Sequence, residues 1–330
     1  MAVTFPNGSA RGPQNGEVRQ DAVAAGFARL PESYAIPERA PSLAEARAYC
    51  ERLARSHYEN FSVASWFLPR NLHQHFFSVY SYCRISDDLG DEVGDEQLSL
   101  ALLDRWEREL AATYEKLGNP AAEGSRHPVF IALAETIREC QIPQHEFSDL
   151  LVAFRQDQTV TRYPKFDDVL GYCHYSANPV GHLVLYVCGY RDAERQLLSD
   201  YTCTALQLAN FWQDVAVDWQ KNRVYLPLED LARFGVSESD IAERRFSSEF
   251  RELMRFEVAR ARQWFERGLP LVGMVNRELA LDLELFSRGG LAILDAIEKQ
   301  DYNVLAQRPV VSKGRKMMLL LRALAGKVRA

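Results

Sequence analysis

The sequence predicts an all-α protein in which many helices surround one core. Apolar residues recur at helical spacing through most of the chain, as in the half-exposed segment Leu98–Leu117. No segment alternates apolar and polar residues as a half-buried strand would, and no Gly-rich phosphate loop follows a strand-like run. We therefore expect one large helical bundle over residues 41–330. Residues 1–40 carry repeated Gly and Pro without periodicity, which indicates a flexible N-terminal arm.

The first expected helix begins at a capping box, in which Glu45 follows Ser42 by three positions, and it extends to about Ser56. Pro69 interrupts the chain before the next expected helix. Shorter helices are expected after Pro227. The other helices are expected over Leu72–Leu89, Leu98–Leu117, Pro128–Cys140, Pro143–Gln158, Phe166–Cys188 with a kink at Asn178-Pro179, 193–221, Ser248–Gly268, Pro270–Arg288 and Leu291–Lys299.

Composition excludes several functional classes. A net charge of −6 and a pI near 5.7 argue against a dedicated nucleic-acid-binding protein. No apolar run is long enough to span a membrane, and the N-terminus lacks the apolar core of a signal peptide. The six cysteines form no C-x-x-C pair, so they indicate small buried side chains in a reducing cytoplasm. We expect a cytoplasmic protein.

One predicted helix carries a stripe of amides and carboxylates. Gln207, Asn210, Asp214 and Asp218 follow one another at helical spacing, so at about 100° per residue they fall within an arc of roughly 80°. The remaining faces hold aromatic and aliphatic residues, which indicates a buried helix. Two carboxylates one turn apart repel each other unless a cation joins them. If these carboxylates were buried without a positively charged partner, they would destabilise the folded protein.

A second acidic cluster has nearly the same spacing. Tyr80, Arg84, Asp87 and Asp91 fall on one face of the helix expected over Leu72–Leu89 and its continuation. Taken alone, such a pattern is also typical of a solvated helix end. Two helices that each point an i,i+4 pair of Asp into a shared cavity would instead make a hard-oxygen site for Mg²⁺, which binds a few carboxylates and bridges to phosphate oxygens. Arg84 is placed to add a bidentate phosphate contact.

Such a site favours one kind of chemistry. Metal ions neutralise a leaving diphosphate, so that an allylic or cyclopropylcarbinyl C–O bond can ionise to a carbocation. A cavity lined by aromatic residues then holds the cation away from bulk water. The chain contains 14 Tyr and 17 Phe, several of them beside the two Asp segments. This abundance permits the interpretation without deciding it.

Three segments resemble the squalene/phytoene synthase family. They are Tyr80 to Asp91, YCHYSANPVG at 172–181, and QLANFWQDVAVDWQKNRVYLP at 207–227. The resemblance implies the isoprenoid synthase fold, an isoprenoid diphosphate substrate and more than one Mg²⁺ ion. It implies that the metal ligands are Asp87, Asp91, Asp214, Asp218 and Asn210. It implies catalytic roles for these four aspartates and for Tyr80 and His57. The implied substrate-binding residues are Arg84, Gln207, Asn210, Arg223, Tyr225, Tyr172, Ser176 and Asn178.

Within the family, HYENF (57–61) and NFWQDV (210–215) resemble the bacterial hydroxysqualene synthases, which convert presqualene diphosphate and water to hydroxysqualene and diphosphate. Condensing members usually carry Arg where this chain has Gln213, and a basic residue where it has Glu59. A site with fewer basic residues suits a single substrate with one diphosphate group better than two substrates that each carry one. Val217 also replaces a usual acidic residue. We expect no requirement for NADPH. His57 is the candidate for orienting water, with Tyr58, Glu59 and Asn60 left open.

Two other functions remain open on the sequence alone. The chain could be a head-to-head condensing synthase that makes presqualene diphosphate, squalene or phytoene. It could also be a non-catalytic family member acting in assembly or lipid binding, although such a protein has no need for four intact aspartates.

The C-terminal segment from Tyr302 to Ala330 has no acidic residue and is basic at Arg308, Lys313, Arg315, Lys316, Arg322, Lys327 and Arg329. The simpler interpretation is a last helix that packs on the bundle and has solvated basic ends. The alternative is peripheral contact with an anionic inner-membrane surface, where each basic residue near lipid contributes about 1 kcal/mol.

Overall fold

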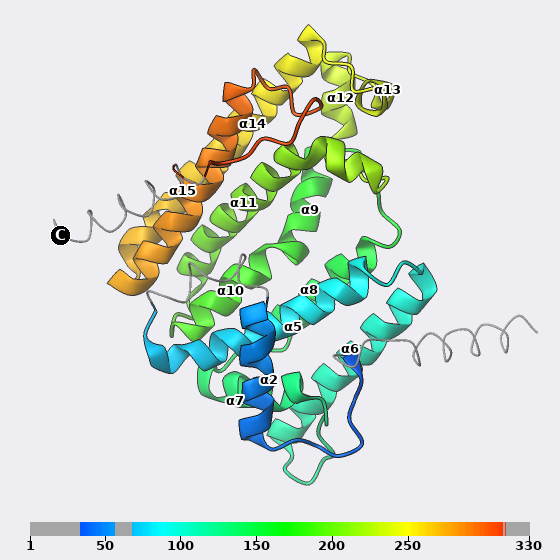
Figure 1. The fold of residues 1–330 in the computed structure, drawn as a ribbon. Helices are drawn as coiled ribbons and strands as arrows, with labels where there is room; N and C mark the ends of the chain where they lie inside the picture. The colour runs from blue at the N-terminus through cyan, green and yellow to red at the C-terminus, as the bar shows by residue number, and fades with distance from the viewer. Residues whose placement is uncertain (1–33, 57–67, 313, 315–330) are drawn as a thin grey trace, which may run out of the picture.

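A computed structural model of the protein describes residues 34–56, 68–312 and 314 (Figure 1). Helices dominate this part of the chain, and it contains no β-strand; a single isolated bridge joins Arg162 to Val224. The all-α prediction is therefore confirmed. No helix of the described part is long and apolar enough to cross a membrane. None of the six cysteines is in a disulfide. The residues from His57 to Phe67 lie outside the described part.

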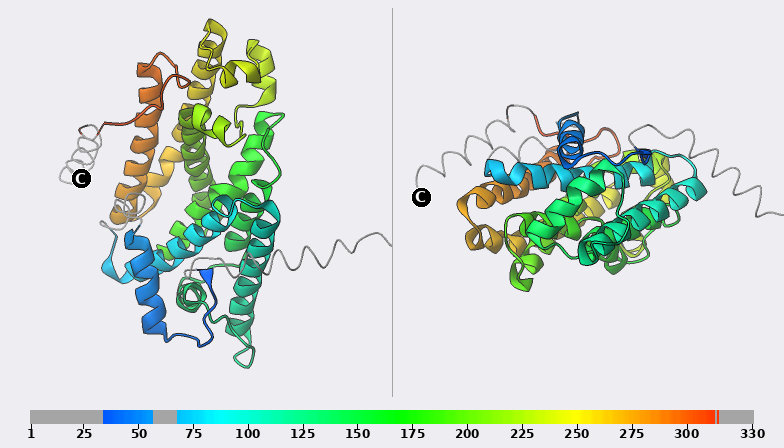
Figure 2. Two further views of the ribbon diagram at one scale, coloured as in Figure 1. Left: turned by 45° about the vertical axis from the view of Figure 1, so that its right-hand side comes forward. Right: turned by 90° about the horizontal axis from the view of Figure 1, so that it is seen from below.

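The helices pack against one another in a bundle (Figures 1 and 2). In chain order they are α2 (Leu43–Ser56), η2 (Arg70–Leu72), α5 (His73–Asp91), α6 (Glu96–Gly118), α7 (Pro128–Cys140), α8 (His145–Gln156), α9 (Phe166–Ser176), α10 (Asn178–Val187), α11 (Ala193–Gln220), α12 (Leu228–Phe234), α13 (Glu238–Ala242), α14 (Ser248–Gly268), η3 (Leu269–Met274) and α15 (Arg277–Lys299).

Helix starts follow local capping chemistry. The predicted capping box at α2 is present, because the Ser42 backbone N–H donates to Glu45 Oε2 at 2.7 Å and the Glu45 N–H donates to Ser42 Oγ at 3.3 Å. The side chains of Asp95 and Asp192 cap α6 and α11 by accepting from backbone N–H groups three residues later. Each cap satisfies a donor that the first helical turn leaves without a partner.

Two clusters of buried apolar side chains form the core. One gathers α2, α5, α6, α7 and most of α8 and α10. The other gathers α9, α11, α14, the end of α15 and the residues that follow it. The two acidic stripes lie on α5 in the first cluster and on α11 in the second. Helices α8, α9 and α10 pack between them, because α8 contacts α5 while α9 and α10 contact α11.

The chain breaks where the sequence predicts a kink. Ala177 separates α9 from α10 with φ −118° and ψ −46°, and Pro179 lies within the first turn of α10. Proline lacks a backbone N–H, so it destabilises a helix least in the first turn, where that N–H would have no partner within the helix. The separation lets α10 contact α5, α8 and α11 at once.

The predicted break between Arg288 and Leu291 is wrong, because α15 runs without interruption through Gly289 and Gly290. The predicted helix over Pro270–Arg288 instead begins as η3, and α15 starts at Arg277. A Cβ on residue 290 would overlap the ring of Phe265 and lie 2.8 Å from Leu206 Cδ2. Gly290 therefore permits close packing of α15 on α14 and α11, and it does not end a helix.

Replacing the two neighbouring glycines should have opposite effects. Gly290→Ala should lower the free energy of unfolding by about 1–3 kcal/mol, because the new methyl group overpacks the core. At Gly289 no atom lies within 4 Å of the added Cβ. There, alanine should raise the free energy of unfolding by about 0.5–1 kcal/mol through its better helix propensity. Urea unfolding of both variants measures the difference, and equal effects would contradict this packing.

A buried ion cluster joins three helices away from the acidic stripes. His182 on α10 lies with Nδ1 2.9 Å from Glu146 Oε2 on α8 and with Nε2 2.7 Å from Asp200 Oδ1 on α11. Burial acts to lower the pKa of His182, but the hydrogen bonds and charges of Asp200 and Glu146 outweigh it and raise this pKa to about 9. The imidazolium thus bridges two carboxylates.

Stability should depend on pH through this cluster. The pKa of His182 is higher in the folded than in the unfolded chain, where it is about 6.5. The contribution is complete below pH 6.5 and is lost as pH rises to about 9, and we expect it to be about 2 kcal/mol after solvent screening. Urea unfolding between pH 6.5 and 9.5 should show this loss in wild type and in the control His174→Gln. In His182→Gln the loss over this range should be smaller by about this 2 kcal/mol.

The end of the predicted N-terminal arm is attached to the bundle. Tyr34 donates its hydroxyl hydrogen to Asp88 Oδ2 at 2.8 Å, and Arg126 donates to the Glu38 carbonyl at 2.9 Å. Residues 34–40 therefore differ from the flexible arm expected over 1–40, because side chains distant in sequence hold them. Residues 1–33 lie outside the described part.

Candidate active site

A cavity of about 510 Å³ opens between α5 and α11, a size typical of small-molecule sites. Its walls also include α8, α9, α10 and the residues that follow α11. The lining consists of Tyr80, Cys83, Arg84, Asp87, Asp91, Leu150, Phe154, Asp157, Tyr172, Ser176, Val180, Gln207, Asn210, Phe211, Asp214, Val217, Asp218, Lys221, Arg223 and Tyr225. Both acidic stripes therefore face the same space, as the sequence predicts.

Nearly all the predicted site residues reach this cavity. Two do not appear in its lining. Asn178 is buried, and its side-chain oxygen accepts a hydrogen bond from Thr204 Oγ1 at 3.1 Å, so its position does not support the predicted contact with substrate. The Asn-Pro pair marks the start of α10, and its amide serves the packing of α10 on α11. His57 lies outside the described residues, so its predicted catalytic role stays a prediction.

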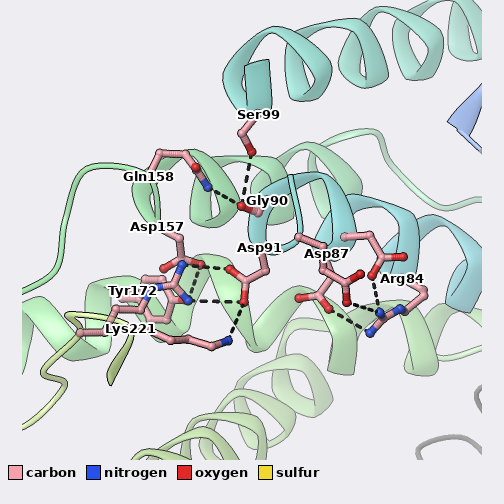
Figure 3. Close-up of polar contacts among 12 residues, drawn as sticks. Arg84, Asp87, Gly90, Asp91, Ser99, Asp157, Gln158, Tyr172 and Lys221 are labelled. Atoms are coloured by element: carbon pink, nitrogen blue, oxygen red, sulfur yellow. Dashed lines mark hydrogen bonds and ion pairs between the residues drawn. The ribbon is translucent and has the colours of Figure 1, made fainter. Parts of the chain in front are cut away.

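On the α5 wall, one arginine is surrounded by acidic side chains (Figure 3). The Arg84 guanidinium lies 3.4 Å from Asp87 Oδ2 and 3.0 Å from Glu92 Oε1, and it also pairs with Asp88. Tyr34 holds the other oxygen of Asp88. Arg84 is therefore fixed at the cavity edge by its own helix and by the end of the N-terminal arm.

The two aspartates of this wall differ in electrostatic environment. Burial, and then the negative charge of Asp91, raise the pKa of Asp87 to about 6. Burial also acts to raise the pKa of Asp91, but the hydrogen bond and charge of Arg223 and the charge of Lys221 lower it. Arg223 Nη2 lies 2.9 Å from Asp91 Oδ1, and Lys221 Nζ lies 3.6 Å from Asp91 Oδ2. Asp87 thus has the less compensated charge.

On the α11 wall the pattern repeats. Arg308 binds both oxygens of Asp214, with Nη2 3.0 Å from Oδ2 and Nε against Oδ1. Burial, followed by the charge of Asp214, raises the pKa of Asp218 to about 7. Each wall therefore holds one aspartate paired with an arginine from elsewhere in the chain and one whose charged form is disfavoured.

Sequence reasoning missed a fifth carboxylate in the cavity. Asp157 follows α8, and it accepts a hydrogen bond from the Tyr172 hydroxyl at 2.9 Å (Figure 3). Burial raises its pKa to about 6, although Arg223 and Tyr172 act to lower it. A single Asp at the end of a helix gives no spacing signal, so its role follows only from the fold. Lys221 was missed for the same reason.

Aromatic side chains form one side of the cavity. The rings of Phe211 and Tyr225 stack with centroids 3.8 Å apart and an interplanar angle of 7°. Tyr172 lies 5.7 Å from Tyr225, and Tyr163 stacks behind Tyr225 at 5.5 Å. The faces of such rings attract cations. Ser176 Oγ, which also lines the cavity, has no hydrogen-bond partner among the described residues.

The structure alters the interpretation of Gln213. This side chain does not line the cavity; it is buried, and its amide contacts Arg308 and the Pro309 carbonyl. Its lack of charge therefore cannot be read as a missing direct contact to a second diphosphate. Glu59, the other residue on which that argument rested, lies outside the described part.

The donor set fits Mg²⁺. All four predicted aspartate ligands present hard oxygens to one cavity. Burial, and then the charge of the neighbouring aspartate, raise the pKa of Asp87 and of Asp218, and a cation would offset both effects. Among the described residues no three His, Cys, Asp or Glu side chains are grouped closely enough to hold a metal ion on their own. An ion here would complete its shell with water and phosphate oxygens, as Mg²⁺ commonly does.

Comparison with known proteins agrees with this geometry. The family model for squalene/phytoene synthase matches residues 54–315. This chain belongs to the squalene/phytoene synthase family. Members are enzymes that act on isoprenoid diphosphates, and the fold is the isoprenoid synthase fold.

Individual relatives cover most of the chain. The crystal structure of squalene synthase HpnC from Alicyclobacillus acidocaldarius is 43% identical, with a TM-score of 0.73 over 84% of this chain and 99% of that one. A dehydrosqualene synthase in complex with a ligand is 25% identical, with a TM-score of 0.76 over 87% and 98%. Chloroplastic phytoene synthase 1 of Zea mays is 30% identical over 84% of this chain and 68% of its own length.

Removing the Tyr172 hydroxyl should destabilise the protein through Asp157. In Tyr172→Phe a buried carboxyl oxygen loses its partner, which should lower the free energy of unfolding by about 1–2 kcal/mol. Tyr175→Phe is the matched control, because the Tyr175 hydroxyl makes no hydrogen bond to the described residues. Urea unfolding tests both variants, and a Tyr172→Phe protein as stable as the control would contradict the assigned hydrogen bond.

Proposed function

We propose that this protein is a Mg²⁺-dependent enzyme that converts presqualene diphosphate and water to hydroxysqualene and diphosphate. The observation that carries the proposal is the pair of i,i+4 aspartates on each of two facing helices, all four lining one partly apolar cavity. Mg²⁺ held by Asp87, Asp91, Asp214 and Asp218, with support from Asn210, would neutralise the diphosphate as it leaves.

The chain's own residues have separable tasks in this reaction. Arg84, Lys221 and Arg223 line the cavity and supply positive charge for phosphate oxygens. The C–O bond to diphosphate breaks with its electron pair on the leaving oxygen. The stacked rings of Phe211 and Tyr225 would border the resulting carbocation and shield it from bulk water. The carbocation then rearranges as a cyclopropane C–C bond breaks, and a water oxygen forms the new C–O bond at the resulting cationic carbon and releases a proton.

Similarity to known proteins favours a squalene-type product over phytoene. The chain is 43% identical to a squalene synthase over nearly all of that protein, against 30% to a plant phytoene synthase. The segments HYENF and NFWQDV also resemble hydroxysqualene synthases. The second candidate is a head-to-head condensing synthase, which the similarity to phytoene synthases favours.

One assay separates these reactions. The purified protein is given either presqualene diphosphate or farnesyl diphosphate, with Mg²⁺ and without NADPH, and lipid products are identified by mass spectrometry. We expect hydroxysqualene from presqualene diphosphate only, and no product when Mg²⁺ is chelated. Consumption of farnesyl diphosphate would favour the condensing synthase, and turnover of neither substrate would support a non-catalytic member.

The aspartate variants test the site itself. Asp87→Ala and Asp214→Ala should each abolish product while leaving the far-UV circular dichroism unchanged, because the residues serve the ligand rather than the fold. Asp167→Ala is the control, since Asp167 is an exposed aspartate of α9 outside the cavity lining. Near-full activity of either cavity variant would refute the two-wall site.

We also propose a cytoplasmic location with peripheral contact with the inner-membrane surface. Of the basic C-terminal residues, Arg308 is engaged by Asp214. The others, from Lys313 onward, lie outside the described residues. Flotation with anionic liposomes at low and high salt tests the contact, which should weaken as salt screens it.

A further inference from the structure

The residues after α15 form a strap that returns to the cavity. Residues 300–312, named here the C-terminal strap, leave the end of α15 and pass back across the second core cluster (Figures 1 and 2). Val304 and Leu305 are fully buried in that cluster. An ion pair of 2.6 Å joins Asp301 to Arg251 on α14. The strap is therefore attached at its base, at residues that precede Arg308, the strap residue that contacts Asp214.

A second attachment lies at Gln213, beside the acidic pair of α11. Gln213 Nε2 donates to the Pro309 carbonyl at 2.5 Å, and Gln213 Oε1 accepts from Arg308 Nη2 at 3.2 Å. Gln213 is 5% exposed, so its amide exchanges neither bond readily with water. The same Arg308 guanidinium binds both oxygens of Asp214. One buried amide thus fixes both the backbone and the side chain that bring a positive charge to Asp214.

We propose that Gln213 is a positioning residue that holds Arg308 on Asp214 as a placeholder cation, which a divalent metal ion must displace. The inference rests on the proposed metal role of Asp214. Arg308 donates to each carboxylate oxygen of Asp214 and balances its negative charge, so a metal ion ligated there would compete with the guanidinium. The Arg308 side chain is 47% exposed, which leaves it room to move outward.

The chemistry of residue 213 sets the strength of this hold. An amide offers one donor for Pro309 and one acceptor for Arg308, which the contacts use in full. A cationic side chain at this position would repel the guanidinium at contact distance. An apolar one would leave the strap held by its base and by the buried Pro309, without a hydrogen bond to residue 213. The uncharged Gln213 thus keeps Arg308 on Asp214. Through Arg308 it lowers the affinity of the Asp214–Asp218 pair for a metal ion.

The test measures Mn²⁺ binding, as a spectroscopic substitute for Mg²⁺, by electron paramagnetic resonance on the full chain without substrate. Gln213→Met keeps the size of the side chain and removes both hydrogen bonds. It should lower the Kd for Mn²⁺ by about three- to tenfold, as expected for loss of a partly exposed competing ion pair and its support. Arg308→Gln should lower the Kd at least as much, and the double variant should match Arg308→Gln alone.

Val310→Ser is the control on the strap, because Val310 is 67% exposed and the strap carbonyl that Gln213 binds belongs to the neighbouring Pro309. It should leave the Kd unchanged. A second readout is hydrogen exchange of residues 304–310 in metal-free protein, which should be faster in Gln213→Met than in wild type.

The outcomes separate the two proposals. If wild type binds Mn²⁺ and Asp214→Asn weakens that binding, the metal role of Asp214 stands. An unchanged or higher Kd in Gln213→Met would then overturn the placeholder role alone. If Asp214→Asn leaves Mn²⁺ binding unchanged, the metal role proposed for Asp214 fails, and the placeholder role fails with it.

Discussion

The repulsion between paired carboxylates is the constraint on which the rest of this structure depends. Two aspartates one turn apart on a largely buried helix are costly unless positive charge reaches them. The fold meets that need twice with arginines from distant parts of the chain. Arg223, just beyond α11, pairs with Asp91 on the opposite wall, and Arg308, from the C-terminal strap, pairs with Asp214. The partners left over, Asp87 and Asp218, have raised pKa values.

The arrangement of the helices follows from where these charges must meet. Each acidic helix belongs to a different core cluster, so its apolar faces are buried while its acidic face borders the space between the clusters. The break at Ala177 lets α9 and α10 close that space from one side. The two described ends of the chain also contribute, because Tyr34 supports the Asp88–Arg84 pair and the strap delivers Arg308. The site therefore depends on the whole chain rather than on two motifs.

Helical periodicity predicted much of this from the sequence alone. Spacing placed Asp87 with Asp91 and Asp214 with Asp218, because residues on one face of a helix are fixed by 3.6-residue geometry. It did not reveal Asp157, whose proximity to Tyr172 depends on how α8 packs on α9. Nor did it reveal that Arg308 reaches Asp214, since the two are 94 positions apart.

The differences between the sequence-based expectations and the structure have the same origin. Gly289-Gly290 resembles a helix break, but the glycines sit inside α15 because Gly290 lies against Phe265. Asn178 belongs to a segment that resembles the family, yet its amide faces Thr204. Gln213 was interpreted through charge at the substrate, whereas its amide faces the strap. In each case the sequence shows the type of side chain, but it does not show which part of the fold that side chain contacts.

The central claim is that the two aspartate pairs act together on one metal–diphosphate ligand. Calorimetric titration of inorganic diphosphate, with and without Mg²⁺, tests it directly in wild type, Asp87→Asn, Asp214→Asn and the double variant. The account predicts Mg²⁺-dependent binding that each single substitution weakens about tenfold or more, with a coupling energy between the two sites of about 1 kcal/mol or more. Equal binding without Mg²⁺, or purely additive effects of the two substitutions, would contradict it.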